Sequence, residues 1–264
     1  MGLSRNSKCC HPEEHSDEGS QREKILRFAQ NDKNAPFSNS SKLKKKAVVL
    51  LSGGLDSATT LYIAKAKGYK AYCLIFDYGQ RHKKELLCAK TLAKRNDCDF
   101  HILKISLPWK GSSLLDKKSS IPKGVIKRSE IPSTYVPGRN IIFLSYGVSY
   151  AEAIGAKKVF IGANQLDYSG YPDCRYSFIE AFGRAVDEGT KSGLKKNTRI
   201  KIEVPLIYKS KRDIICMAVK LGVPLEYTWS CYRGGKKPCN ECDSCLIRQE
   251  AFEKAGVNDP AAYC

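Results

Sequence analysis

The pattern of apolar and polar positions after residue 46 predicts alternating strands and helices. Short apolar runs that suit buried strands occupy residues 47–51, 71–76, 100–105, 158–162 and 200–204. Segments with helical character occupy residues 57–67, 82–95, 140–154, 176–188 and 210–221, and Ser210 with Asp213 has the spacing of a helix-start cap. Such alternation is typical of a parallel sheet covered on both faces, with ligands beyond the carboxyl ends of the strands. We therefore predict an α/β fold with a doubly wound, five-stranded parallel sheet.

Composition divides the chain into three regions. Residues 1–46 are polar and lack helix or strand periodicity, so we expect them to be disordered. This extension resembles translated intergenic repeat DNA, which would make it an artefact of an upstream start site. Residues 47–225 form the predicted catalytic domain, and residues 226–264 form a cysteine-rich C-terminal segment. Residues 106–135 are rich in Ser, Pro and Lys, and we expect them to form a mobile flap near the site.

Charge, hydrophobicity and cysteine content indicate the compartment and the partners that this protein is expected to have. The 264 residues carry a formal net charge of +18, and no apolar run approaches the roughly 18 residues that a membrane helix needs. The N-terminus lacks the apolar core of a signal peptide, so we expect a cytoplasmic protein whose 12 cysteines form no disulfide framework. A basic surface attracts phosphates, including those of RNA, but charge alone does not distinguish an RNA-binding surface from a solvated one.

Residues 47–57, AVVLLSGGLDS, carry the clearest functional signal in the chain. A buried strand leads directly into a loop with two glycines, and a helix starts near Ser57. Because glycine has no Cβ, its backbone N–H can come close to a phosphate, and the first turn of a helix favours bound anions. The hydroxyls of Ser52 and Ser57 could donate to phosphate oxygens, whereas Asp56 suits the Mg²⁺ that accompanies a triphosphate. The alternative is a glycine turn that only joins strand to helix.

The hexapeptide SGGLDS at 52–57 resembles the PP-loop of the ATP pyrophosphatases. A kinase-type P-loop would end in GK[ST], which is missing here. The resemblance implies an adenine nucleotide α-hydrolase-like fold and cleavage of ATP between its α- and β-phosphates. The ATP-binding residues that it implies are Leu51, Ser52, Gly53, Gly54, Leu55, Asp56, Ser57, Ala58, Thr59, Thr60 and Leu61. Asp56, Ser57 and Arg139 are the expected catalytic residues.

Four cysteines near the C-terminus have the spacing of a metal site. They are Cys231, Cys239, Cys242 and Cys245, in the pattern C-x7-C-x2-C-x2-C. Two-residue gaps let neighbouring thiolates point into one tetrahedron, and four sulfurs leave no open position, which favours one structural Zn²⁺ per chain. A [4Fe–4S] cluster is the alternative, because spacing does not firmly separate the two metals.

Longer stretches of the chain resemble the 7-cyano-7-deazaguanine synthase family of queuosine biosynthesis. They are LSGGLDSATTL (51–61), FDYGQRH (76–82), YVPGRN (135–140), DYSGYPDC (167–174) and TWSCYRGGKKPCNECDSC (228–245). This resemblance implies an ATP-dependent carbon–nitrogen ligase that converts 7-carboxy-7-deazaguanine and ammonia into the nitrile through an adenylated acid and an adenylated amide. It also implies Mg²⁺ with ATP and a homodimer, with no membrane and no direct nucleic acid required.

The loop at 163–174 is the expected site of the deazapurine. The rings of Tyr168 and Tyr171 would stack on its faces, and Asp167 or Asp173 would accept from its amine and ring N–H groups. Arg139 would neutralise the triphosphate or the adenylate. The alternatives are a structural tyrosine-rich turn and a surface arginine at a helix start.

Two other functions stay open. Cys174 lies near the expected site, so a tRNA base sulfurtransferase of the same superfamily, which delivers sulfur from a cysteine, is one alternative. A non-enzymatic, basic zinc-knuckle protein that binds RNA is the other. Such a binding protein would not need the SGGLDS loop.

Overall fold

The computed structural model describes residues 44–109, 111–116, 118–124, 131–166 and 171–263 of the chain. The predicted N-terminal extension lies almost wholly outside these residues, as do Asp167 and Tyr168. From Lys44 onward the chain forms one compact unit. Its main elements are β1 (Lys46–Leu50), α2 (Leu55–Ala66), β2 (Lys70–Asp77), α3 (Lys84–Arg95), β3 (Asp99–Lys104), α4 (Arg139–Ile154), β4 (Lys158–Phe160), α5 (Tyr176–Gly189), β5 (Lys201–Glu203), α6 (Lys211–Lys220) and α7 (Asp243–Ala255). Within the described residues, no helix has the length and apolar character needed to span a bilayer.

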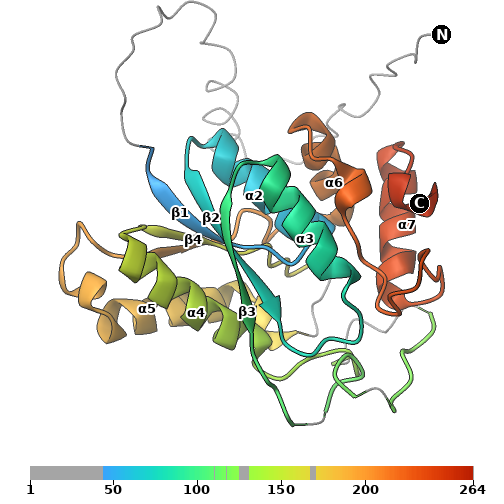
Figure 1. Cartoon of the computed structure of the whole chain (residues 1–264), viewed down its shortest axis with the longest axis horizontal. Coiled ribbons are helices and arrows are strands. Elements are labelled where there is room, and N and C mark those ends of the chain that lie inside the picture. Colours follow the sequence, from blue (N-terminus) through green and yellow to red (C-terminus); the bar gives the residue numbers. More distant parts are fainter. Residues whose placement is uncertain (1–43, 110, 117, 125–130, 167–170, 264) are drawn as a thin grey trace, which may run out of the picture. The chain divides into compact units, whose positions relative to one another are not determined.

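The strands form one parallel sheet with the order β3-β2-β1-β4-β5 (Figure 1). β1 pairs with β2 on one side and β4 on the other, so that Val49 lies opposite both Cys73 and Phe160. At this point the strand order reverses, which is where open α/β sheets leave a crevice at the carboxyl ends of their strands. The predicted doubly wound sheet is confirmed, and each predicted strand begins and ends within two residues of an observed one.

Helices cover both faces of the sheet, and the side chains of each strand alternate between two apolar cores. On β1, Ala47 and Val49 belong to the core shared with α2, α3, α6 and α7, whereas Val48 and Leu50 belong to the core shared with α4 and α5. Figure 1 shows α4 and α5 together on one side of the sheet and α2, α3 and α6 on the other. Burial of both faces explains why the strands appear in the sequence as continuous apolar runs.

The structure contains a helix that the sequence analysis did not predict. α7 begins directly after Cys242 and packs against α6, and its residues Ala251 and Phe252 are buried. Its sequence, DSCLIRQEAFEKA, has few large apolar residues, so its periodicity gives a weak helical signal. The C-terminal segment therefore packs on the domain through α6 in addition to carrying the cysteine cluster.

The long insertion at 106–135 contacts both a core of the sheet and the cysteine-rich segment. Leu114 and Ile121 are buried in the core shared with α4 and α5. The backbone N–H of Gly124 donates to the carbonyl of Glu241 at 2.9 Å. The insertion lies beside the predicted site, as expected, because Leu114 lines the pocket there. Its movement as a flap stays a prediction.

Gly53 follows β1 at a place where no side chain fits. Its φ is +87°, and a Cβ atom there would lie 2.2 Å from the carbonyl oxygen of Glu85 and 2.8 Å from the backbone nitrogen of Ala89. Both of these residues belong to α3, so the loop after β1 packs directly on the backbone of that helix. Close packing therefore requires glycine here. The sequence pattern had indicated a different reason, the close approach of a phosphate.

We expect Gly53→Ala to destabilise the protein by about 2 kcal/mol or more, because the added methyl group must displace backbone atoms of α3. Chemical denaturation measures the change in the free energy of unfolding. Gly183→Ala is the matched control: no atom lies within 4 Å of its added Cβ, and it sits in α5, where alanine is the better helix former. Equal stability of the Gly53→Ala variant and the unsubstituted protein would contradict the packing argument.

Candidate functional site

A pocket of about 240 Å³ lies at the carboxyl edge of the sheet, where the strand order reverses. It is formed by residues at or just after the ends of β1, β2 and β4 and by the first turns of α2, α3 and α4. From these elements the lining residues include Leu50, Leu51, Ser52, Gly54, Leu55, Asp56, Ser57, Phe76, Tyr78, Glu85, Arg139, Asn140, Ile161 and Gly162. The glycine-bearing loop therefore faces a pocket and is not sealed inside the protein.

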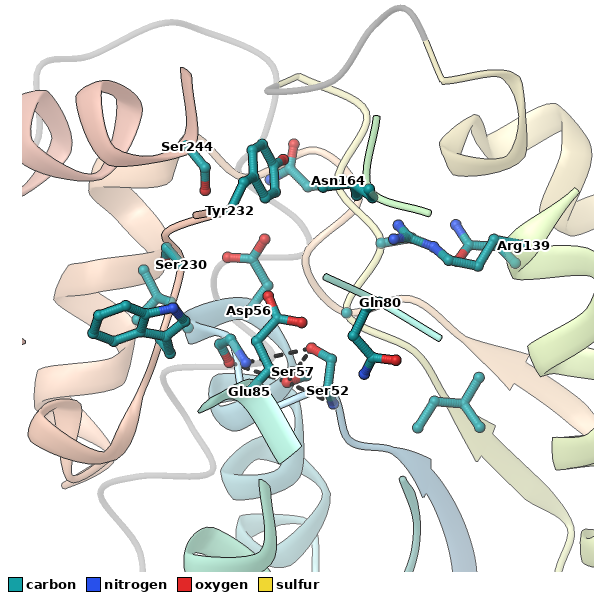
Figure 2. Close-up of a pocket in the computed structure, with 18 of the residues that line it drawn as sticks. Ser52, Asp56, Ser57, Gln80, Glu85, Arg139, Asn164, Ser230, Tyr232 and Ser244 are labelled. Atoms are coloured by element: carbon teal, nitrogen blue, oxygen red, sulfur yellow. Dashed lines mark hydrogen bonds between the residues drawn. The ribbon is translucent and has the colours of Figure 1, made fainter. Parts of the chain in front are cut away.

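Ser57 organises the loop from the first turn of α2. Its hydroxyl oxygen accepts from the backbone N–H of Ser52 at 3.2 Å (Figure 2) and from that of Gly53 at 3.2 Å, and its hydroxyl donates to the carbonyl of Gly54 at 3.0 Å. The backbone N–H of Gly54 in turn donates to the hydroxyl of Ser52 at 3.3 Å. The two glycine N–H groups thus already have acceptors inside the loop. An incoming phosphate would have to replace these bonds.

Asp56, also in the first turn of α2, is paired with Lys211 at the start of α6. The Nζ of Lys211 lies 2.9 and 2.8 Å from the two carboxylate oxygens, and both side chains are largely buried. Ser210 and Asp213 form a capping box that fixes the start of α6 and so places Lys211. The predicted cap is confirmed, whereas the ion pair was not predicted. A cation therefore already faces the carboxylate that the sequence analysis assigned to Mg²⁺.

The cysteine-rich segment forms another wall of the pocket. Trp229, Ser230, Tyr232 and Ser244 line it, and Figure 2 labels the last three. The backbone N–H of Trp229 donates to the carbonyl of Gly53 at 2.9 Å, which joins this segment to the loop after β1. No pattern in the sequence marked these residues as part of a pocket, because the cysteine spacing indicates only a metal centre.

Arg248 on α7 holds this wall in place. Its side chain is buried and forms a two-point ion pair with Asp259, with N–O distances of 2.7 and 2.9 Å. It also donates to the hydroxyls of Thr228 at 3.0 Å and Ser230 at 3.2 Å. Charge-assisted bonds of this kind are strong and directional, so α7 fixes the path of the chain on both sides of Trp229.

Arg139, the first residue of α4, lies on the other side of the pocket (Figure 2). Its guanidinium donates to the hydroxyl of Tyr78 at 3.3 Å and lies 5.9 Å from the centre of that ring. No carboxylate among the described residues forms an ion pair with it. A guanidinium held by a neutral group keeps its charge available for a phosphate or an adenylate, the role predicted for Arg139.

Of the four residues predicted to bind the deazapurine, the structure describes Tyr171 and Asp173, and only Tyr171 lines the pocket. Tyr171 is buried and lines the pocket. Asp173 is buried but does not line the pocket, and its carboxylate accepts from the backbone N–H of Asn140 at 3.0 Å. That bond satisfies a free donor in the first turn of α4, so Asp173 contributes to the fold. The other two, Asp167 and Tyr168, lie outside the described residues.

Cys174 lines the pocket, as the sulfurtransferase alternative requires. Burial, together with the nearby carboxylate of Asp173, raises the pKa of its thiol to about 12. The side-chain amide of Asn140 donates to its sulfur at 3.3 Å. Because the thiolate is the nucleophile, a thiol with this pKa is poorly suited to sulfur transfer at neutral pH.

Glu85, in the first turn of α3, is a site residue that the sequence analysis missed. Its side chain lines the pocket and points into the same space as Asp56 and Ser57 (Figure 2). Burial raises the pKa of its carboxyl group to about 7, and the charge of Arg139 limits the rise. An acidic residue in the first turn of a helix is common on dipole grounds, so no sequence pattern marked Glu85 as functional.

The four cysteines of the C-terminal segment converge as predicted. The sulfur atoms of Cys231, Cys239, Cys242 and Cys245 all lie within 4.8 Å of one another, and those of Cys239 and Cys245 are 3.9 Å apart. Thiolates bound to a tetrahedral zinc at about 2.3 Å would be separated by roughly 3.8 Å. Backbone N–H groups of Cys239 and Cys242 donate to cluster sulfurs at 3.4 and 3.3 Å, which suits negatively charged ligands. This group of side chains could hold a metal ion.

Comparison with known proteins places these observations in a family match that covers most of the chain. The family model described as "Queuosine biosynthesis protein QueC" matches residues 46–256. The chain belongs to this family. Relatives named 7-cyano-7-deazaguanine synthase from Clostridium kluyveri and Acetivibrio thermocellus are 49% and 52% identical to it, over 83% of this chain and 98% of each relative. A relative of the same name from Thermoplasma acidophilum is 51% identical over 83% of this chain and 92% of its own length.

The match to the QueC family includes every residue that lines the pocket. It contains the loop after β1 and the four cysteines, whereas residues 1–45 lie outside it. The resemblance inferred from the sequence is therefore confirmed over all of the stretches on which it was based.

We expect Cys242→Ser to lose the bound metal, because Cys242 is fully buried and its sulfur is one of four converging ligands. Structural zinc contributes on the order of 10 kcal/mol in small peptides, so the unfolding temperature should fall as well. Elemental analysis of the purified protein counts metal ions per chain. Cys98→Ser, outside the cluster, is the control and should keep the metal. Full metal content in the Cys242→Ser variant would refute the site.

Proposed function

We propose that this chain converts 7-carboxy-7-deazaguanine and ammonia into 7-cyano-7-deazaguanine at the expense of ATP, as a step of queuosine biosynthesis. One observation carries the proposal: the SGGLDS loop faces a pocket that Arg139 and Tyr171 also line. The relatives that bear the synthase name are 49–52% identical over 83% of the chain, which supports the same assignment.

The proposed reaction removes both oxygens of a carboxylate by two activations. A carboxylate oxygen is a poor leaving group and AMP is a good one, so the carboxylate attacks the α-phosphate of ATP and pyrophosphate leaves. Ammonia displaces AMP and gives the amide. The amide oxygen attacks a second ATP, and loss of AMP and two N–H protons leaves the nitrile. The enzyme contributes mainly positioning and stabilisation of charge.

The pocket offers a group for each of these needs. The loop after β1 and the start of α2, including Ser57, would bind the β- and γ-phosphates. Arg139 would neutralise the α-phosphate or the adenylate. Asp56 would hold the Mg²⁺ that accompanies ATP, which when bound offsets phosphate charge. The ring of Tyr171 would stack on the deazapurine.

The cysteine cluster is proposed to hold one structural Zn²⁺ per chain. Four cysteine ligands complete a tetrahedron and leave no position for substrate. The rival [4Fe–4S] cluster would appear as iron in elemental analysis. We also propose a homodimer, for which the exposed apolar side chains of Ile141 and Tyr146 on α4, 46% and 43% exposed, offer a contact surface.

Purified protein should release AMP and pyrophosphate from ATP only when 7-carboxy-7-deazaguanine is present, because adenylation needs the attacking carboxylate. Mass spectrometry should then detect the nitrile when ammonia is supplied. No turnover with the carboxy compound, or transfer of sulfur to tRNA, would contradict the proposal.

Asp56→Asn should reduce pyrophosphate release by about a hundredfold or more while the protein stays folded, because it removes the negatively charged ligand proposed for the Mg²⁺ that accompanies ATP. A continuous pyrophosphate assay measures the rate, and circular dichroism checks the fold. Asp99→Asn is the matched control, since the exposed carboxylate of Asp99 pairs only with Lys70 on the surface. Turnover in the Asp56→Asn variant equal to that of the control would remove Asp56 from the mechanism.

A further inference from the structure

Glu85 is an acidic side chain of the pocket that has no partner in the described part of the chain. It lines the pocket together with Asp56 and Ser57. No hydrogen bond or ion pair joins its carboxylate to any described residue. Asp56 differs, because both of its carboxylate oxygens bind the ammonium group of Lys211.

The packing of α3 keeps Glu85 beside the loop after β1. The carbonyl oxygen of Glu85 lies so close to Gly53 that a Cβ atom there would come within 2.2 Å of it. The neighbouring residues Leu86 and Ala89 are buried in the core beneath the helix. The base of the Glu85 side chain therefore stays next to the loop, and only its own torsions can turn the carboxylate.

An unpaired carboxylate next to a polyphosphate creates an electrostatic conflict. The phosphate oxygens and the ionised carboxylate of Glu85 carry the same sign of charge, and a partly buried site screens their repulsion poorly. Two nearby cations are already paired, Lys211 with Asp56 and Arg248 with Asp259. The charge of Arg139 limits the rise in the pKa of Glu85 but does not cancel it. A divalent cation between the carboxylate and the phosphates would convert repulsion into attraction. Carboxylate and phosphate oxygens are also the ligands that Mg²⁺ prefers.

We propose that Glu85 is a ligand of the divalent cation that enters with the nucleotide, and that it shares this ion with Asp56 and the phosphate oxygens. The inference rests on the proposed function only in requiring that ATP binds in this pocket. It explains why the pocket contains a carboxylate without a protein partner: the partner arrives with the substrate.

Binding of Mn²⁺ tests the proposal without any turnover. Zinc-loaded protein saturated with α,β-methylene-ATP, which is not cleaved between the α- and β-phosphates, is titrated with Mn²⁺, and electron paramagnetic resonance follows the free ion. Glu85→Gln should weaken Mn²⁺ binding at least about tenfold, because an amide oxygen carries no negative charge. Glu85→Asp, which keeps the charge on a shorter side chain, should recover part of the affinity.

Glu180→Gln is the matched control, since Glu180 is exposed on α5 and does not line the pocket; it should bind Mn²⁺ as the unsubstituted protein does. Glu85→Gln should also bind the metal-free analogue as tightly or more tightly, because repulsion is removed, and a misfolded variant would not. Equal Mn²⁺ affinity of Glu85→Gln and the unsubstituted protein would overturn the role of Glu85. Failure of the unsubstituted protein to bind the analogue at all would overturn the proposed function, and this inference with it.

Discussion

The close contact between the loop after β1 and the backbone of α3 is the constraint on which the site depends. Gly53 has a φ of +87° and no room for a Cβ against Glu85, and its carbonyl accepts from the backbone N–H of Trp229. Three segments that are distant in the sequence therefore meet at one residue. A side chain at Gly53 would separate them, so the shape of the loop follows from packing as much as from any need to approach a phosphate.

The cysteine cluster contributes to the pocket although its sulfurs do not line it. The indole N–H of Trp229 donates to the carbonyl of Cys231 at 2.9 Å, and the ammonium of Lys84 on α3 lies 3.7 Å from the centre of a Trp229 ring. Arg248, on the helix that begins at the cluster, bonds to Thr228 and Ser230 on either side of Trp229. A bound metal would thus order the C-terminal segment and one wall of the pocket together, which would couple stability to the proposed nucleotide binding.

The charges of the pocket fall into two groups. Asp56 with Lys211, and Arg248 with Asp259, are ion pairs within the protein. Glu85 and Arg139 have no ion-pair partner among the described residues. Unpaired charges of opposite sign suit a ligand that carries both, as a nucleotide with its divalent cation does. Burial leaves the thiol of Cys174 uncharged at neutral pH, which agrees with adenylation better than with sulfur transfer.

Features that depend on neighbours along the chain could be predicted from the sequence alone. Continuous apolar runs located the strands, the SGGLDS loop at 52–57 located the edge of the pocket, and cysteine spacing located the four thiols that could hold a metal ion, because each pattern is local. Only the tertiary structure decided that Lys211 pairs with Asp56, that Glu85 faces the pocket and that Trp229 helps to form its wall. These contacts join residues far apart in the sequence, and their distances are set by how helices pack on the sheet, which no local pattern records.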